Sequence, residues 1–145
     1  MSAHAVGLLD TSVVILLGQI TDPELLPVNA QISAVTLAEL SVGPLVARSP
    51  AERAARQAHL QYAEADFHPL PFNAEAARAF GLVAANLRAA GRKPAARSFD
   101  AMIAATAIAN GLPLYTFNPR DFEPIDSLIV VALPRPRRPE IDPRQ

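Results

Sequence analysis

The sequence of 145 residues contains no cysteine, and no apolar stretch approaches the ~18 to 20 residues that cross a bilayer. Without cysteine, a disulfide framework, a thiolate nucleophile, an iron–sulfur cluster and a Cys-rich zinc site are all excluded. The first residues also lack the basic region that opens a secretory signal. We therefore expect a soluble, cytoplasmic protein with no membrane partner.

Basic residues are missing from the first third of the chain. Residues 1–47 carry four acidic side chains and no Lys or Arg, whereas the rest holds all thirteen basic groups. The formal net charge of −1 gives no global basic field that would announce a nucleic-acid partner. A chain of this length with 50% hydrophobic residues forms one core, which we predict to span residues 1–133. Residues 134–145, with four prolines and no apolar periodicity, are predicted to be a Pro/Arg-rich tail.

Short apolar runs alternate with helix signals along the chain. Strands are predicted at residues 5–9, 30–35, 112–116 and 128–133, with a further short edge strand at 67–72. Helices are predicted from Val13, from a Thr36-Leu37-Ala38-Glu39 capping box, and after the cap residues Ser49, Asn73 and Ser98. This alternation implies right-handed crossovers and an α/β fold whose mostly parallel sheet is covered on both faces.

Acidic residues stand where the predicted strands end. Asp10 ends the first strand, Glu39 lies in the first turn of the helix after the second, and Asp121 follows the third by five residues. The carboxyl ends of parallel strands and the helices that follow share one edge of such a sheet, so these side chains should meet there. Asp100 joins them if its helix begins just before it.

Three of the four acids also have a simpler interpretation when taken singly. Glu39 completes a capping box, Asp100 suits a helix dipole, and Asp121 could close a turn. Asp10 is harder to explain in this way, because an unpaired charge at the end of a buried strand is costly.

Together the four acids indicate a bound cation. Two carboxylates about 5 Å apart repel by roughly 3 kcal/mol at an effective dielectric near 20, and a cation is the simplest compensation. Oxygen ligands without cysteine favour Mg²⁺ or Mn²⁺ over zinc. The three histidines, at positions 4, 59 and 68, have no metal-ligand spacing and suit surface or packing roles.

Basic side chains flank two of the acids. Arg92, Lys93 and Arg97 precede Asp100, and Arg120 adjoins Asp121. A metal held by carboxylates suits phosphodiester hydrolysis, so these cations are candidates for contacts to RNA phosphates. Solvated loop charges are the alternative interpretation of each.

Four segments of the chain stand out together: LLDTSVVI at 8–15, TLAELSVG at 36–43, SFDAMIAATAIANGLPLYT at 98–116 and FNPRDF at 117–122. In order and spacing they resemble the signature segments of the PIN-domain ribonucleases, and most closely those of the VapC-type toxins of type II toxin–antitoxin pairs. The resemblance runs from about Val6 to Val131. It implies a three-layer α/β/α domain with a mostly parallel sheet of four to five strands.

The resemblance also implies a catalytic set and partners. Asp10, Glu39, Asp100 and Asp121 match the family's acids, with Asp10 and Asp100 as metal ligands. Thr11, Ser12, Thr116 and Asn118 match small polar residues that line the pocket. Family members usually form homodimers and are held inactive by a cognate antitoxin protein.

The leading hypothesis is an endoribonuclease toxin that requires Mg²⁺ or Mn²⁺ and hydrolyses RNA with a metal-activated water. The alternative is a non-catalytic module of the same fold that binds RNA or a protein, and such a module would bind RNA equally well in EDTA. A P-loop NTPase is disfavoured because no Gly-x-x-x-x-Gly-Lys-Ser/Thr loop is present. Asp10→Ala is expected to abolish cleavage and leave the fold intact.

Overall fold

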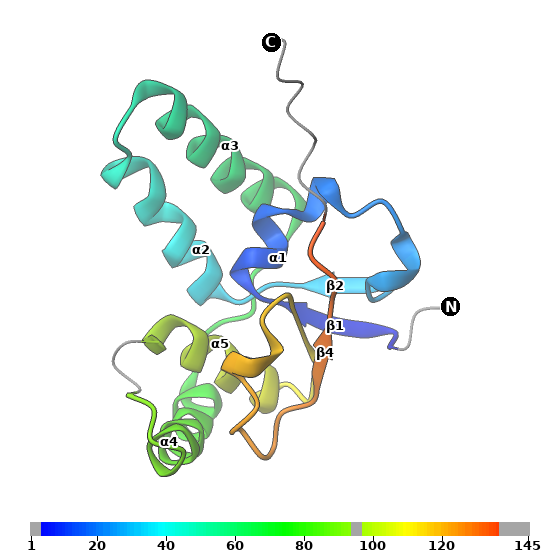
Figure 1. Cartoon of the computed structure of the whole chain (residues 1–145), viewed down its shortest axis with the longest axis vertical. Coiled ribbons are helices and arrows are strands. Elements are labelled where there is room, and N and C mark those ends of the chain that lie inside the picture. The colour runs from blue at the N-terminus through cyan, green and yellow to red at the C-terminus, as the bar shows by residue number, and fades with distance from the viewer. Residues whose placement is uncertain (1–3, 94–96, 137–145) are drawn as a thin grey trace.

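Four short strands form one parallel sheet at the centre of the structure, a computed structural model that describes residues 4–93 and 97–136 (Figure 1). Their order across the sheet is β2-β1-β3-β4. The bounds are Val6–Leu9 for β1, Asn29–Gln31 for β2, Leu114–Thr116 for β3 and Val130–Ala132 for β4. Every pairing between neighbouring strands is parallel, which confirms the predicted α/β class.

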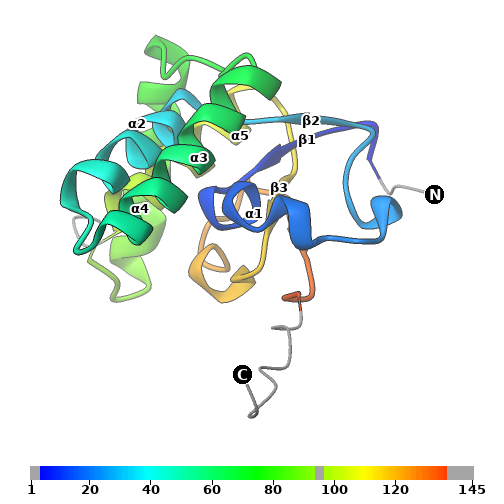
Figure 2. The same ribbon diagram turned by 90° about the horizontal axis from the view of Figure 1, so that it is seen from above.

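Helices connect the strands and cover the sheet. The α-helices are α1 (Thr11–Ile15), α2 (Ala34–Val42), α3 (Pro50–Asp66), α4 (Ala74–Ala89) and α5 (Ser98–Ala109). Short 3-10 turns are η1 (Leu17–Gln19), η2 (Pro23–Leu25), η3 (Gly43–Val46) and η5 (Pro119–Asp121). Figures 1 and 2 show α2 and α3 as an antiparallel pair joined through η3, with α4 beside α5. Within the described ranges, no helix is both long and apolar enough to cross a membrane.

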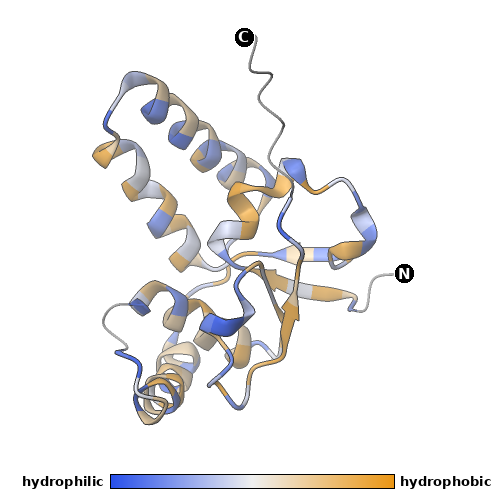
Figure 3. Ribbon diagram, in the orientation of Figure 1, coloured by the Kyte–Doolittle hydropathy of each residue, from blue (hydrophilic) through white to orange (hydrophobic). Residues whose placement is uncertain are grey.

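The two faces of the sheet carry separate hydrophobic cores, because successive side chains of a strand point to opposite faces. Leu8 and its β3 partner Leu114 are fully buried in the core that holds α4 and α5. Leu9 and Tyr115 belong to the other core, with residues of α1 and α3. Figure 3 shows β1 and β4 largely hydrophobic, whereas hydrophilic residues recur along α3. The expected three layers are therefore present.

A glycine in β1 makes room for the largest fully buried side chain. A Cβ atom on Gly7 would lie 2.4 Å from Cε2 of Tyr115 and 3.2 Å from Cγ of Pro27. The ring of Tyr115 is 1% exposed, so it has little freedom to move aside. Gly7 is therefore required by packing and not by backbone conformation.

Two of the predicted helix caps are confirmed and two are wrong. The side chains of Ser49 and Asn73 accept hydrogen bonds from backbone N–H groups at the starts of α3 and α4. The helix α2 begins one turn earlier than predicted, since Ser33 and not Thr36 caps it through the N–H of Val35. Ser98 is the first residue of α5, and the N-cap Arg97 makes no capping bond with its side chain.

The predicted edge strand at 67–72 is reduced to a single parallel bridge between Ser33 and Leu70. Pro69 and Pro71 flank Leu70, and proline has no N–H to donate, so the ladder cannot extend. The predicted boundary between domain and tail after Leu133 stays a prediction, and residues 137–145 lie outside the described residues.

Candidate active site

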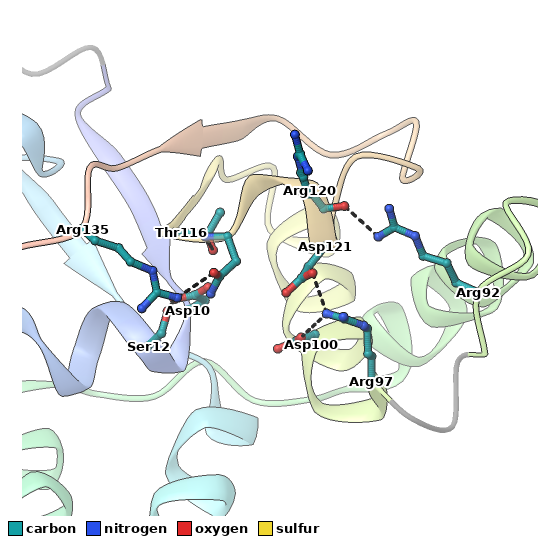
Figure 4. Close-up of polar contacts among 10 residues, drawn as sticks. Asp10, Ser12, Arg92, Arg97, Asp100, Thr116, Arg120, Asp121 and Arg135 are labelled. Carbon is teal, nitrogen blue, oxygen red and sulfur yellow. Dashed lines mark hydrogen bonds and ion pairs between the residues drawn. The ribbon is translucent and has the colours of Figure 1, made fainter.

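Four carboxylates that are far apart in the sequence line one cleft of about 170 Å³. Asp10 directly follows β1, Glu39 lies in α2, Asp100 in the first turn of α5, and Asp121 at the end of η5. In the strand order, β2 lies on one side of β1 and β3 on the other. A ligand site is expected outside the carboxyl ends of the strands at this switch of direction. Figure 4 shows three of the acids there, Asp10, Asp100 and Asp121.

Asp10 both caps α1 and faces the cleft. Its Oδ1 accepts hydrogen bonds from Ser12 Oγ at 2.8 Å and from the N–H of Val13 at 3.0 Å. The residue is 4% exposed. Among the described residues nothing donates to Oδ2, so that oxygen remains available to a ligand in the cleft.

Two threonines hold Glu39 in place. Thr11 Oγ1 donates to Glu39 Oε1 at 2.9 Å and lies 3.0 Å from the hydroxyl of Thr36, which is fully buried. The hydroxyl of Thr36 therefore bonds across to α1 and does not cap α2. Glu39 consequently lies in the second turn of α2 and faces the cleft, so its interpretation as a capping-box residue is wrong.

Crowding of like charges is strongest at Asp100. Burial, and then the nearby carboxylates of Glu39, Asp10 and Asp121, raise the pKa of Asp100 from 3.8 to about 6, against a lowering by Arg97. The pKa of Glu39 is also raised, first by burial and further by Asp10, although the hydrogen bond from Thr11 opposes the rise. The cleft therefore holds more negative charge than its surroundings neutralise, which is the condition for binding a cation.

Arg97, an exposed residue, supplies a positive charge beside the cleft. Its Nη1 lies 2.6 Å from Asp121 Oδ1 and 4.0 Å from Asp100 Oδ2. Figure 4 shows the guanidinium between these two carboxylates. A sequence-based candidate for phosphate binding thus turns out to be bound to the acids themselves.

The donor atoms fit a hard divalent cation. Carboxylate, hydroxyl and amide oxygens line the cleft, and none of the described histidines does. No group of three or more His, Asp or Glu side chains in the described part of the chain already converges on one metal position. The ion pair with Arg97 accounts for part of this spread, because Asp121 is directed toward the guanidinium. Asp10 and Asp100 line the same cleft, and neither has a guanidinium within hydrogen-bond distance among the described residues. They remain the candidates for metal ligands.

The remaining predicted residues fall in different places. Thr11, Ser12 and Asn118 line the cleft. Thr116 does not, because its side chain is fully buried and its Oγ1 accepts from the N–H of Asn118 at 2.9 Å. That contact makes Thr116 a support for Asn118 behind the wall.

The other basic candidates stand farther out. Arg92 donates from Nη1 to the backbone oxygen of Arg120 at 2.7 Å, while both residues stay near the surface (Figure 4). Lys93 is exposed and makes no hydrogen bond or ion pair within residues 4–93 and 97–136. None of these three side chains lines the acidic cleft.

Sequence reasoning missed three residues near the cleft. Ile15 and Phe122 contribute apolar wall, and Ile15 could have been found because it lies one helical turn after Thr11. Arg135 donates from Nη2 to Asn118 Oδ1 at 2.7 Å. Arg135 was predicted to lie in the tail. Its position just after β4, a strand parallel to its neighbour, would have predicted it at the same edge of the sheet as the cleft.

The fold and the cleft together define an α/β domain with an acidic site at the carboxyl ends of its strands, and comparisons with known proteins agree with this fold. The PIN domain family matches residues 7–128. The chain is 38% identical over 133 residues to ribonuclease VapC5 of Mycobacterium tuberculosis, covering 90% of this chain and 96% of that protein. It is 30% identical to ribonuclease VapC of Rickettsia bellii, covering 73% and 78%.

A solved structure shares the same architecture. The VapBC-5 toxin–antitoxin complex of Mycobacterium tuberculosis matches with a TM-score of 0.73 and 36% identity, over 89% of this chain and 99% of that one. The chain therefore belongs to the PIN domain family and, within it, to the VapC group.

Proposed function

We propose that this chain is a divalent-metal-dependent endoribonuclease and the toxin of a toxin–antitoxin pair. The observation that carries the proposal is the cleft itself, in which four carboxylates from separate elements meet despite their mutual repulsion. The names of the relatives, ribonucleases VapC5 and VapC, support RNA as the substrate. A module that only binds RNA would gain nothing from concentrated negative charge at its centre.

Asp10 and Asp100 would hold Mg²⁺ or Mn²⁺ between the carboxyl end of β1 and the amino end of α5. When bound, such an ion acidifies a water molecule and neutralises charge on a phosphate oxygen. Asp10 is suited to this role because both of its protein hydrogen bonds fall on Oδ1. Asp100 is suited because burial and the neighbouring carboxylates disfavour its charge, which a cation would relieve.

Glu39 and Asp121 would position the attacking water. Thr11 binds Oε1 of Glu39, which leaves Oε2 free of the described donors and able to accept a proton from water. The raised pKa of Glu39 favours such an acceptance. Asp121 lines the same cleft from η5, and the ion pair with Arg97 orients its carboxylate.

The experiment is cleavage of a labelled single-stranded RNA by the purified chain in Mn²⁺, in Mg²⁺ and in EDTA. We expect cleavage with either metal, none in EDTA, and products with 5′-phosphate and 3′-hydroxyl ends. Asp10→Asn is the control for a contaminating nuclease. Products with 2′,3′-cyclic phosphate would overturn the water mechanism, and metal-independent binding without cleavage would support the non-catalytic alternative.

The proposed partners are an antitoxin and a second copy of the chain. The solved relative was crystallised as a VapBC toxin–antitoxin complex, which supports an inhibitory protein partner here. The homodimer rests on the resemblance to the family. Co-expression with the product of a small adjacent gene should give a stable complex that does not cleave RNA, and the molar mass in light scattering should show whether the free chain is a dimer. Full cleavage activity in such a complex would contradict the toxin assignment.

A further inference from the structure

The last described residues return to the cleft. After β4, Leu133 continues the ladder by donating its N–H to the backbone oxygen of Thr116 at 2.8 Å, and its side chain is 6% exposed. Two residues later, Arg135 Nη2 donates to Asn118 Oδ1 at 2.7 Å. Asn118 lines the acidic cleft.

The parallel sheet explains why an arginine at this position reaches the site. Thr116 pairs with Ala132 and Leu9 with Tyr115, so the chain leaves β4 at the same edge at which Asp10 follows β1. Prolines at 134 and 136 bracket Arg135, and proline restricts both its own backbone and that of the residue before it to extended conformations. The guanidinium is thus carried on a stiff segment anchored by the buried Leu133.

Arg135 differs from Arg97 in its electrostatic state. Arg97 is bound to Asp121, whereas the partner of Arg135 is a neutral amide, and within the described ranges Arg135 makes no ion pair. The amide orients the guanidinium without cancelling its charge, and one hydrogen bond leaves most of its five N–H donors unused. Figure 4 shows Arg97 joined to Asp100 and Asp121, with Arg135 apart from this group.

We propose that Arg135 is a substrate-positioning residue that binds an RNA phosphate next to the scissile one, on the Asp10 side of the cleft. This inference rests on the ribonuclease function proposed above. An RNA strand that crosses the cleft would have Arg135 at one end. The basic side chains of Arg92, Arg97 and Arg120 would lie at the other end. The scissile phosphate of that strand would then lie over the carboxylates, where its charge is otherwise repelled. Arg135, which the sequence assigned to the tail, therefore completes the substrate path.

The test compares Arg135→Gln, Arg135→Lys and wild type in binding to a labelled single-stranded RNA at several salt concentrations. Arg53→Gln is the matched control, since it removes the same charge from an exposed position on α3 that lines a different hollow. We expect Arg135→Gln to bind roughly tenfold more weakly at 100 mM salt, with a salt slope lower by about 0.7, the value for one phosphate of a single strand. In cleavage, KM should rise while kcat stays close to wild type, because the contact is made equally in substrate and transition state.

A second variant and the melting temperature distinguish phosphate binding by Arg135 from a purely structural role. Arg135→Lys keeps the positive charge but loses the planar guanidinium, which can bind a phosphate through two N–H groups. It should therefore retain the salt slope while losing part of the affinity for RNA. If Arg135 only ties down the chain end, Arg135→Gln will lower the melting temperature without changing the salt slope, and the inference is wrong. If wild type itself neither binds nor cleaves RNA, the ribonuclease function fails. If wild type is active and Arg135→Gln matches it in affinity, slope and KM, only the role of Arg135 fails.

Discussion

The guanidinium of Arg97 lies 2.6 Å from the carboxylate of Asp121, so an ion pair beside the acidic cleft joins the N-cap residue of α5 to η5. The pair gives one side chain two opposing effects. Its positive charge lowers the pKa of the neighbouring Asp100, yet the same charge repels a divalent cation from those carboxylates. Binding of metal and binding of RNA should therefore respond in opposite directions when Arg97 is changed.

For Arg97→Gln at pH 8, where Asp100 is ionised, we expect Mn²⁺ to bind about tenfold more tightly, because one unit of local positive charge is removed. RNA should bind more weakly, with a salt slope lower by about 0.7. Titration calorimetry with Mn²⁺ and anisotropy with labelled RNA measure the two effects, and Arg97→Lys should show smaller changes in both. Weaker Mn²⁺ binding by Arg97→Gln would mean that the arginine organises the metal ligands and does not compete with the ion.

Asp10→Asn is predicted to lower cleavage at least about 100-fold and to leave the fold intact, since loss of a metal ligand costs more than loss of an outer partner. For Asp10→Ala the structure adds a cost in stability to the expected loss of cleavage. Asp10 caps α1, so alanine removes the acceptor for Ser12 and Val13 and should destabilise the chain by about 1 kcal/mol. Asparagine retains an oxygen that accepts these hydrogen bonds. Urea denaturation of both variants therefore distinguishes the effect of losing the helix cap from the effect of losing the charge. Wild-type cleavage by Asp10→Asn would remove Asp10 from the site.

Metal-free stability should depend on pH through Asp100. Its pKa is about 6 in the fold against an ordinary value of 3.8, so the folded chain binds more protons than the unfolded chain between these values. This group's contribution to the free energy of unfolding therefore falls as pH rises from about 4 to about 6. Asp100→Asn removes the titration, so its stability relative to wild type should increase over that interval in urea denaturation with EDTA. A difference that is constant with pH would contradict the raised pKa.

Thr11→Val is expected to raise the pKa of Glu39 further, because the hydrogen bond from Thr11 opposes that rise in wild type. It also leaves the buried hydroxyl of Thr36 without its partner, at a cost of about 1 to 3 kcal/mol. Carboxyl chemical shifts in a pH titration report the pKa directly. Thr11→Ser keeps the hydroxyl and should titrate like wild type, and an unchanged pKa in Thr11→Val would show that the hydrogen bond is not formed in solution.

Gly7→Ala and Gly81→Ala test packing at the sheet. The first places a methyl group 2.4 Å from the ring of the buried Tyr115, so we expect a loss of about 1 to 3 kcal/mol. The second lies within α4, with nothing within 4 Å of the new methyl, and should gain about 0.5 to 1 kcal/mol from helix propensity. Chemical denaturation of both variants gives the comparison. Equal stability of the two would mean that Tyr115 moves aside at no cost.

Local patterns were sufficient to predict much of the fold and part of the site. The short apolar runs that alternate with helix signals predicted the parallel strands. Asp10 was predicted at the cleft because the carboxyl ends of parallel strands share one edge of the sheet. The same local logic was wrong for Glu39. Both Ser33 and Thr36 can cap a helix, and the sequence holds no information on which hydroxyl will be bonded across to Thr11.

The sequence by itself determined the alternation of strands and helices and the acidic residues that follow the strands, because hydrogen-bonding capacity and hydrophobic period are properties of neighbouring residues. Only the tertiary structure decided which side chains the arginines near the cleft contact. The pairing of Arg97 with Asp121, and the contact of Arg135 with Asn118, depend on how α5, η5 and β4 pack around β3. Such contacts bring residues that are distant in the sequence to within a few ångströms of each other. Charge and hydrogen bonding act at that range, but the spacing of the residues in the sequence does not predict which of them will meet.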